Sequence, residues 1–201
     1  MKCSLAITAL LFLTLVGCLG PTLPAPTDSP PPSAQASVNK ADEDWVLIDS
    51  RTDRLTVFVN GSAPAVFENI AVGAAGVKEK RHVGDDVTPR GTYTVGWLQP
   101  HSRFVHFIGL TYPSRTDAAR GYQEGVIDQH TYERIVSALD RGQLPPQDTR
   151  LGGLIGIHGV GSGSIEIHRI ANWTAGCIAV DNDQIRRLFK ILRRGMRVEI
   201  T

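Results

Sequence analysis

The chain has 201 residues, which is enough for one catalytic domain of ordinary size and too few for two large ones. A hydrophobic fraction of 42% and a charged fraction of 20% are typical of a globular protein and not of a disordered or fibrous one. With 21 Lys and Arg against 20 Asp and Glu, the formal net charge is only +1. The chain lacks the basic surplus of a nucleic-acid-binding surface, so we expect no nucleic-acid partner.

The first eighteen residues have the features of an export signal, in the usual order. The positive start Met1-Lys2 precedes an apolar run over residues 5–16, which has the length of a signal-peptide core and is short for a membrane span. The run ends in Leu15-Val16-Gly17-Cys18, which resembles the lipobox of bacterial lipoproteins, where the chain is cut before the Cys and the thiol receives a lipid. The alternative is an ordinary secretory signal in which Cys18 is incidental.

The lipobox resemblance implies a signal peptide over residues 1–17 and a lipid on Cys18 that holds the protein to a membrane of the cell envelope, facing the periplasm. Leu19 stands where an Asp would indicate retention in the inner membrane, so the outer membrane is favoured. Residues 18–41 contain half of the twelve prolines and predict an extended tether. The folded domain is expected over residues 42–201, which is long enough to bury a core.

Runs of β-branched and aromatic residues predict that the domain is mainly β. Strands are expected at residues 45–48, 55–59, 65–67, 70–73, 92–95, 154–158 and 196–201. Asn60-Gly61 predicts a tight hairpin before the third of these strands. The Gly- and Lys-rich stretch 73–88 is expected to be a loop.

Two segments have the i, i+3, i+4, i+7 spacing of amphipathic helices. Their apolar positions are Tyr132, Ile135, Val136 and Leu139 in the first, and Ile185, Leu188, Phe189 and Leu192 in the second. Asp128 and Asp181 are the expected N-caps, and Arg193 and Arg194 are expected in the last turn of the second helix. The predicted fold class is therefore mainly β with a few helices.

Cys177 is the candidate nucleophile. Thiols in an oxidising compartment tend to be paired, absent or functional, and Cys177 has no partner within the domain once Cys18 carries a lipid. It ends the turn Thr174-Ala175-Gly176-Cys177, in which the glycine permits unusual backbone angles and backbone N–H groups could bind a developing oxyanion. The alternative is a buried cysteine that acts as a small apolar residue.

Six histidines are candidates for the base that a nucleophilic cysteine needs, and an active site is expected to lower the pKa of the thiol. His158, which ends an apolar strand before Gly159, is the first choice. His168 is the rival, although alternation would place it beside Glu166 on a solvated face. His106 is the remaining histidine expected to face the site, and the others are interpreted as structural or surface residues: His82, His101 and His130.

A metal or another cofactor is not expected. His158, His168 and Cys177 are suitable zinc ligands by type. They lack, however, the close paired spacing of zinc sites that can be identified from sequence.

Three motifs, in this order, resemble the L,D-transpeptidase catalytic domain of the YkuD type. Thr88-Pro89-Arg90-Gly91-Thr92-Tyr93 resembles the family's Thr-Pro-x-Gly-x-aromatic segment, Ile157-His158-Gly159 its Ile-His-Gly, and Thr174-Ala175-Gly176-Cys177-Ile178 its Ser/Thr-x-Gly-Cys-Ile. The similarity covers about residues 45–201 and implies the family's mixed β-sheet sandwich. Many members carry His two residues before the Cys and Arg two residues after it, where this chain has Ala175 and Ala179.

The resemblance implies a cysteine-dependent peptidoglycan L,D-transpeptidase. Cys177 would attack a stem peptide to form a thioester, His158 would move the proton, and an amine of a second stem would complete a cross-link between third residues. The backbone of Ala175, Gly176 and Cys177 would bind the oxyanion, with Thr174 hydrogen-bonded inside the turn. The residues expected to bind substrate are Gly159, Trp173 and Tyr93.

Three alternatives remain open at this point. The same site could hydrolyse stem peptides as an L,D-carboxypeptidase. The domain could instead be a catalytically silent lipoprotein that binds the wall, a reading that Ala175 and Ala179 favour. A thiol redox sensor would lack a resolving cysteine. We expect the protein to be a monomer.

Overall fold

The computed structural model describes residues 44–60, 62 and 64–201, so the expected signal peptide, Cys18 and the tether lie outside the described residues. Within the described part of the chain, no helix has both the length and the apolar character needed to cross a membrane.

The domain is built on one mixed sheet of eight strands in the order β3-β2-β1-β10-β6-β7-β8-β9, and two short strands, β4 and β5, pair separately. The strands are β1 Trp45–Asp49, β2 Arg54–Phe58, β3 Ala65–Glu68, β4 Val77–Lys78, β5 Thr88–Pro89, β6 Gly91–Ser102, β7 Val105–Leu110, β8 Gly156–Gly159, β9 Ile178–Val180 and β10 Arg197–Ile200. The helices are α1 Arg115–Gln123, α2 Gln129–Asp140, α3 Ile165–Ile170 and α4 Asn182–Ile191. This arrangement confirms the predicted fold class, mainly β with a few helices.

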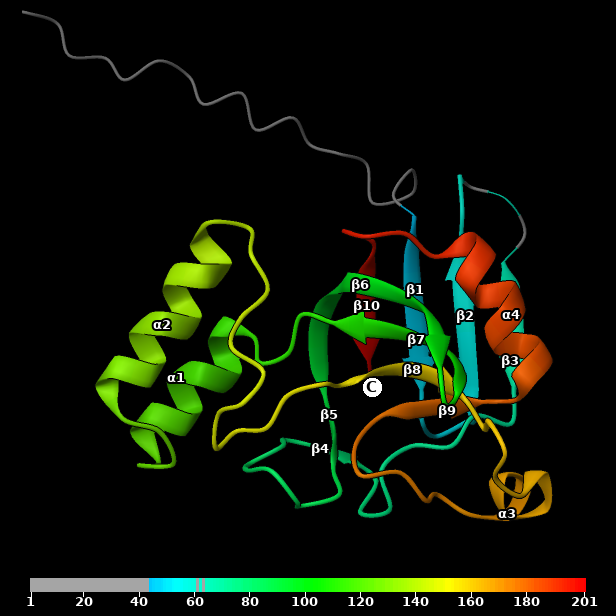
Figure 1. The fold of residues 1–201 in the computed structure, drawn as a ribbon, viewed down its shortest axis with the longest axis horizontal. Coiled ribbons are helices and arrows are strands. Elements are labelled where there is room, and N and C mark those ends of the chain that lie inside the picture. Colours follow the sequence, from blue (N-terminus) through cyan, green and yellow to red (C-terminus); the bar gives the residue numbers. More distant parts are fainter. Residues whose placement is uncertain (1–43, 61, 63) are drawn as a thin grey trace, which may run out of the picture. The chain divides into compact units, whose positions relative to one another are not determined.

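Strand β6 connects the two halves of the sheet. Its residues 91–94 pair with β10, and from Val95 onward it pairs with β7, with a register shift between Val95 and Trp97. In Figure 1, strands β6, β7 and β8 run across the direction of β1, β2 and β10. Side chains from both halves, such as Val46 and Ile157, belong to one buried cluster. The sheet therefore folds over a shared core, which gives the sandwich that the motifs implied.

The two predicted helices are α2 and α4. Asp128 and Asp181 are their N-caps, as predicted, and each accepts a hydrogen bond from a backbone N–H of the first turn. Helix α4 ends at Ile191, so Arg193 and Arg194 lie beyond its last turn, which is a correction to the sequence prediction. Figure 1 shows α2 packed beside α1, and together the two helices lie at one side of the sheet.

Other expectations differ from the structure. Residues 164–168 are not an alternating segment, because the Ser164 hydroxyl accepts the N–H of Ile167 and starts helix α3. The connection between β2 and β3 runs from Phe58 to Ala65, which is longer than the two-residue turn predicted at Asn60-Gly61. Residues 70–73 make isolated bridges instead of a regular strand.

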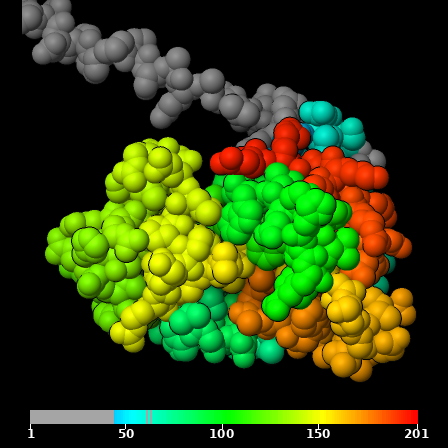
Figure 2. All heavy atoms as spheres, viewed as in Figure 1, coloured from blue at the N-terminus to red at the C-terminus, as the bar shows by residue number. Residues whose placement is uncertain are grey.

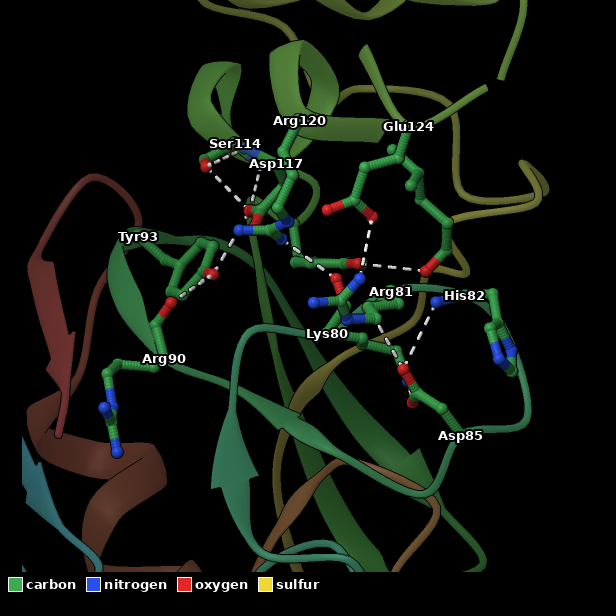
Figure 3. A network of polar contacts seen from close by, with 12 residues as sticks. Lys80, Arg81, His82, Asp85, Arg90, Tyr93, Ser114, Asp117, Arg120 and Glu124 are labelled. Atoms are coloured by element: carbon green, nitrogen blue, oxygen red, sulfur yellow. Dashed lines mark hydrogen bonds and ion pairs between the residues drawn. The ribbon is translucent and has the colours of Figure 1, made fainter. Parts of the chain in front are cut away.

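The expected loop 73–88 contains strand β4 and a buried ion pair. The ammonium of Lys80 pairs with the Asp85 carboxylate, and both side chains are largely shielded from solvent. Arg120 of α1 donates to the Lys80 carbonyl and to Asp117, and the hydroxyl of Tyr93 on β6 donates to Asp117 (Figure 3). These hydrogen bonds connect the segment 73–88 to α1, and α1 to β6.

Candidate active site

Cys177 and His158 line the same cavity, which has a volume of about 680 Å³. Strands β8 and β9 are parallel, with Ile157 opposite Ile178. Cys177 precedes Ile178 and His158 follows Ile157, so their side chains leave the same face of the two neighbouring strands.

The tip of the β6–β7 hairpin forms one wall of this cavity, and residues 173–177 form another. In the space-filling view, the green surface of the hairpin borders the yellow and orange surfaces of the segments that follow residue 150 (Figure 2). Segments far apart in the sequence therefore build the site together.

The ring of His158 is held in one tautomer. Its Nδ1 lies 2.7 Å from the carbonyl oxygen of Gly159, and because a carbonyl only accepts, Nδ1 carries the hydrogen. In the neutral ring, Nε2 then carries a lone pair and can accept a proton. The ring stacks on Phe104 at a centroid distance of 4.1 Å and meets the edge of Trp173 at 5.9 Å. Burial lowers the pKa of His158, which favours the neutral form.

Burial favours the protonated form of the Cys177 thiol. Burial raises the pKa of the thiol to about 11, although a hydrogen bond from the Gly156 backbone and the charge of Lys80 act in the opposite direction. This differs from the lowered thiol pKa that the sequence led us to expect, because the effect of burial outweighs the two that lower the pKa. The shifts of the two pKa values therefore favour a neutral thiol and a neutral imidazole in the same cavity.

The turn before β9 is closed by the hydroxyl of Thr174. This hydroxyl donates to the Cys177 carbonyl at 2.6 Å and accepts the N–H of Gly176 at 3.1 Å. Gly176 has φ +129°, and a Cβ there would lie 2.7 Å from the Val87 carbonyl oxygen, so only glycine fits. The hydroxyl of Thr88, in the first motif, lies 3.4 Å from the same Cys177 carbonyl.

Two backbone N–H groups of the turn are available to a ligand. Those of Ala175 and Cys177 donate to no group in the described part of the chain, whereas that of Gly176 is taken by Thr174. Of the three N–H groups expected to bind the oxyanion, those of Ala175 and Cys177 are open and that of Gly176 is occupied.

Several predicted site residues lie elsewhere. Trp173 lines the cavity, but Gly159 is buried and does not line it, and the N–H of Gly159 donates to the Phe104 carbonyl. Tyr93 is buried beside Asp117 and does not line the cavity. His168 is buried on α3, where its Nδ1 accepts the indole N–H of Trp173 at 3.4 Å, so the tryptophan separates it from the site.

The expected place of His106 is wrong. Its ring stacks on Phe189 of α4 at 4.4 Å, and its Nδ1 bonds to the Pro100 carbonyl, while His101 lines the cavity in its place. Sequence reasoning also missed Arg103 and Phe104 at the hairpin tip. Their position depends on the length and bulges of β6, for which no local pattern is diagnostic.

No group of three or more His, Cys, Asp or Glu side chains in the described ranges is arranged to hold a metal ion. The cavity brings together a thiol, two imidazoles and a guanidinium, from Cys177, His101, His158 and Arg103.

The chain is similar to known proteins in sequence family and in fold. The model of the YkuD family, the L,D-transpeptidase catalytic domain, matches residues 43–200. Among solved structures, a variant of Pgp2, a helical cell shape determining protein from Campylobacter jejuni, has a TM-score of 0.52 at 20% identity, over 80% of this chain and 48% of that one. A second Pgp2 structure gives 0.50 at 20% identity, over 79% and 48%.

An L,D-transpeptidase from Mycobacterium smegmatis has a TM-score of 0.46 at 16% identity, over 79% of this chain and 58% of that one. The present chain thus spans about half the length of these neighbours. At such identities the likeness to Pgp2 shows the fold alone, and no curated protein matches the chain. The family model covers most of the chain, and the chain belongs to the YkuD family of L,D-transpeptidase catalytic domains.

Proposed function

We propose that the protein is a peptidoglycan L,D-transpeptidase in which Cys177 is the nucleophile and His158 the base. One observation carries the proposal: the thiol and an imidazole held with its Nε2 lone pair free leave the same face of neighbouring strands and line one cavity. Membership of the family supplies the class of reaction.

In the first half of the reaction, the Cys177 sulfur attacks the carbonyl carbon of the third residue of a donor tetrapeptide. The thiol proton moves to Nε2 of His158, and the two open N–H groups of Ala175 and Cys177 stabilise the oxyanion. The amide bond to the terminal D-Ala then breaks, and His158 returns the proton to the leaving amine. A thioester on Cys177 remains.

In the second half, the side-chain amine of another stem peptide attacks the thioester carbonyl. An amide forms between the two third residues, the carbon–sulfur bond breaks, and the proton lost by the amine returns to the sulfur through His158. Water in place of the amine would release a tripeptide instead.

The proposal includes the location of the enzyme. The signal and lipobox of residues 1–18 support export and a lipid on Cys18, and residues 18–41 would hold a monomeric catalytic domain of residues 42–201 away from the outer membrane. Expression in a bacterium with and without Cys18→Ala tests this: the membrane fraction should retain the parent protein and release the variant. Equal retention of both would refute lipid anchoring at this residue.

The activity is tested with purified disaccharide-tetrapeptides, read by mass spectrometry, with Cys177→Ala as the control. A cross-linked dimer that the variant cannot make supports transpeptidation, and a tripeptide alone indicates a carboxypeptidase. A folded protein with no product that depends on Cys177 would contradict the enzyme assignment and favour a wall-binding role, tested next on intact sacculi.

A further inference from the structure

Arg103 places a positive charge in the lining of the cavity. It lies at the tip of the β6–β7 hairpin, and it is the one formally charged residue among the described residues that line the cavity. Within the described part of the chain, no carboxylate forms an ion pair with it. The guanidinium therefore has hydrogen-bond donors available for a ligand.

The position of Arg103 is held on both sides. Its guanidinium carbon lies 4.6 Å over the ring of Phe104, which in turn stacks on His158 at 4.1 Å. The Phe104 carbonyl accepts the N–H of Gly159 at 3.1 Å. A Cβ at Gly161 would lie 2.4 Å from the Arg103 carbonyl oxygen, so the hairpin tip rests directly on the backbone after β8. The backbone of the hairpin tip is thus fixed, while the Arg103 side chain rests on the Phe104 ring and is exposed to a ligand.

The other walls of the cavity strengthen the effect of this charge. Trp97, Phe107 and Leu154 present apolar surface, and a charge pair is stronger beside such surface than in open water. Ala179, two residues after Cys177, is fully buried and offers no cation. The guanidinium of Arg103 is thus the charged group that a ligand in this cavity would meet.

We propose that Arg103 binds a carboxylate of the donor stem peptide and makes the site selective for donors that carry this group. The inference rests on the proposed function, because it assigns a residue to that substrate. The carboxylate has two sources, the terminal D-Ala of the donor or the side chain of a third residue that is both a diamino and a dicarboxylic acid. The planar guanidinium fits either one with two parallel hydrogen bonds.

The test measures binding without turnover, in the Cys177→Ala protein. Three synthetic tetrapeptides are titrated: one with both carboxylates free, one with a C-terminal amide and one with the side-chain carboxylate amidated. Each is titrated with and without Arg103→Gln. We expect Arg103→Gln to weaken binding of the peptide with both carboxylates free by about tenfold, as for the loss of a charge-assisted hydrogen bond. The peptide amidated at the contacted carboxylate should bind both proteins equally.

Two further variants make the result specific. Arg103→Lys keeps the charge without the planar fork and should fall between the parent and Arg103→Gln. Arg141→Gln removes an exposed arginine at the end of α2 and should leave the affinity unchanged. Equal affinities with and without Arg103→Gln, in a protein whose Cys177 form makes the cross-link, would overturn the inference alone. No binding and no product that depends on Cys177 would overturn both proposals.

Discussion

The hydroxyl of Thr174 donates to the carbonyl oxygen of Cys177 at 2.6 Å across the turn that presents the thiol. The same hydroxyl accepts the N–H of Gly176 and thereby occupies it. The N–H groups on either side of Gly176 remain open. One threonine side chain thus decides which backbone donors face a ligand.

Thr174→Val is expected to keep the shape of the side chain and to lose both hydrogen bonds. The N–H of Gly176 would then lose its partner, and the Cys177 carbonyl would keep only the longer contact with the Thr88 hydroxyl, so the free energy of unfolding should fall by about 2 kcal/mol. Thioester formation should slow as the turn loosens. Urea unfolding and mass spectrometry of the acyl-enzyme measure the two effects. Thr174→Ser keeps the hydroxyl and should retain both the stability and the rate of thioester formation. A serine variant that loses as much of either as the valine variant would argue against a role for the hydroxyl in holding the turn.

Gly176→Ala should destabilise the domain by about 3 kcal/mol. Its φ is +129°, and the added Cβ would lie 2.7 Å from a backbone oxygen that cannot move aside alone. Gly195→Ala is the matched control, because its φ is +86° with no atom within 4 Å of the added Cβ. The control should lose about 1 kcal/mol from backbone strain only. Equal decreases in the free energy of unfolding of the two variants would show that the close approach at Gly176 does not contribute to the destabilisation.

His158→Gln should lower the rate of Cys177 acylation by about 10²- to 10⁴-fold, the usual contribution of a general base. His168→Gln should leave the rate close to that of the parent protein, since Trp173 separates His168 from the cavity. Intact-mass measurement of the thioester over time gives both rates. Full acylation by His158→Gln together with its loss in His168→Gln would move the base to α3.

Alkylation of Cys177 by iodoacetamide should rise about tenfold per pH unit from pH 7 to pH 10. The pKa of the thiol is raised to about 11, so the reactive thiolate is scarce at neutral pH and increases with each unit below that pKa. The pKa of His158 is lowered by burial, so the imidazole becomes protonated at a lower pH than an ordinary histidine, and turnover should extend to lower pH than an unshifted base would allow. An alkylation rate that levels off near pH 7 would show that the thiol is already ionised there.

Lys80→Met should destabilise the domain by about 3–5 kcal/mol, because it leaves the carboxylate of Asp85 shielded from water without its cation. The double variant with Asp85→Asn should lose less than the sum of the two single losses, which a double-mutant cycle in urea measures. The two losses would be additive if the pair carried no coupling energy.

The pKa of Asp85 gives this pair a pH dependence. Burial raises that pKa, but the hydrogen bonds from Lys80 and from the backbone lower it by more than burial raises it. The net shift of the pKa is therefore downward. With a lowered folded-state pKa, the contribution of Asp85 to stability is complete above the carboxyl's ordinary pKa of about 4 and is lost as the pH falls below it. Unfolding at pH 7 and pH 3 should show this loss in the parent protein and a smaller one in Asp85→Asn.

Much of the fold could be predicted because the hydrophobic patterns of strands and helices extend over only a few neighbouring residues. Alternation at Val46 and Ile48 indicates β1, and the spacing of Ile185 and Leu188 indicates α4. Helix α3 has only six residues, too few for a helical period to show, and the buried face of α1 contains Ala118 and Gly121 instead of large apolar residues.

The candidate site likewise contains residues that could be predicted from the sequence and residues that could not. Cys177 and His158 were found because each sits in a short motif beside a glycine. The hairpin tip with Arg103 and Phe104 was not, because its distance from the motifs is set by the register shifts of β6 and by contact with Gly161. Neither feature leaves a periodic signal in the sequence.

Strand β10 has a consequence for how the protein is made. It lies fourth in the order of the sheet, between β1, with which it runs parallel, and β6. The β3-β2-β1 half and the β6-β7-β8-β9 half therefore join only when residues 197–200 are present. A ribosome that has not yet released these residues holds a chain with two unpaired strand edges and an incomplete core. Pairing of the two halves into one sheet must therefore wait until this segment has been synthesised, so the central strand pairing of the domain forms late.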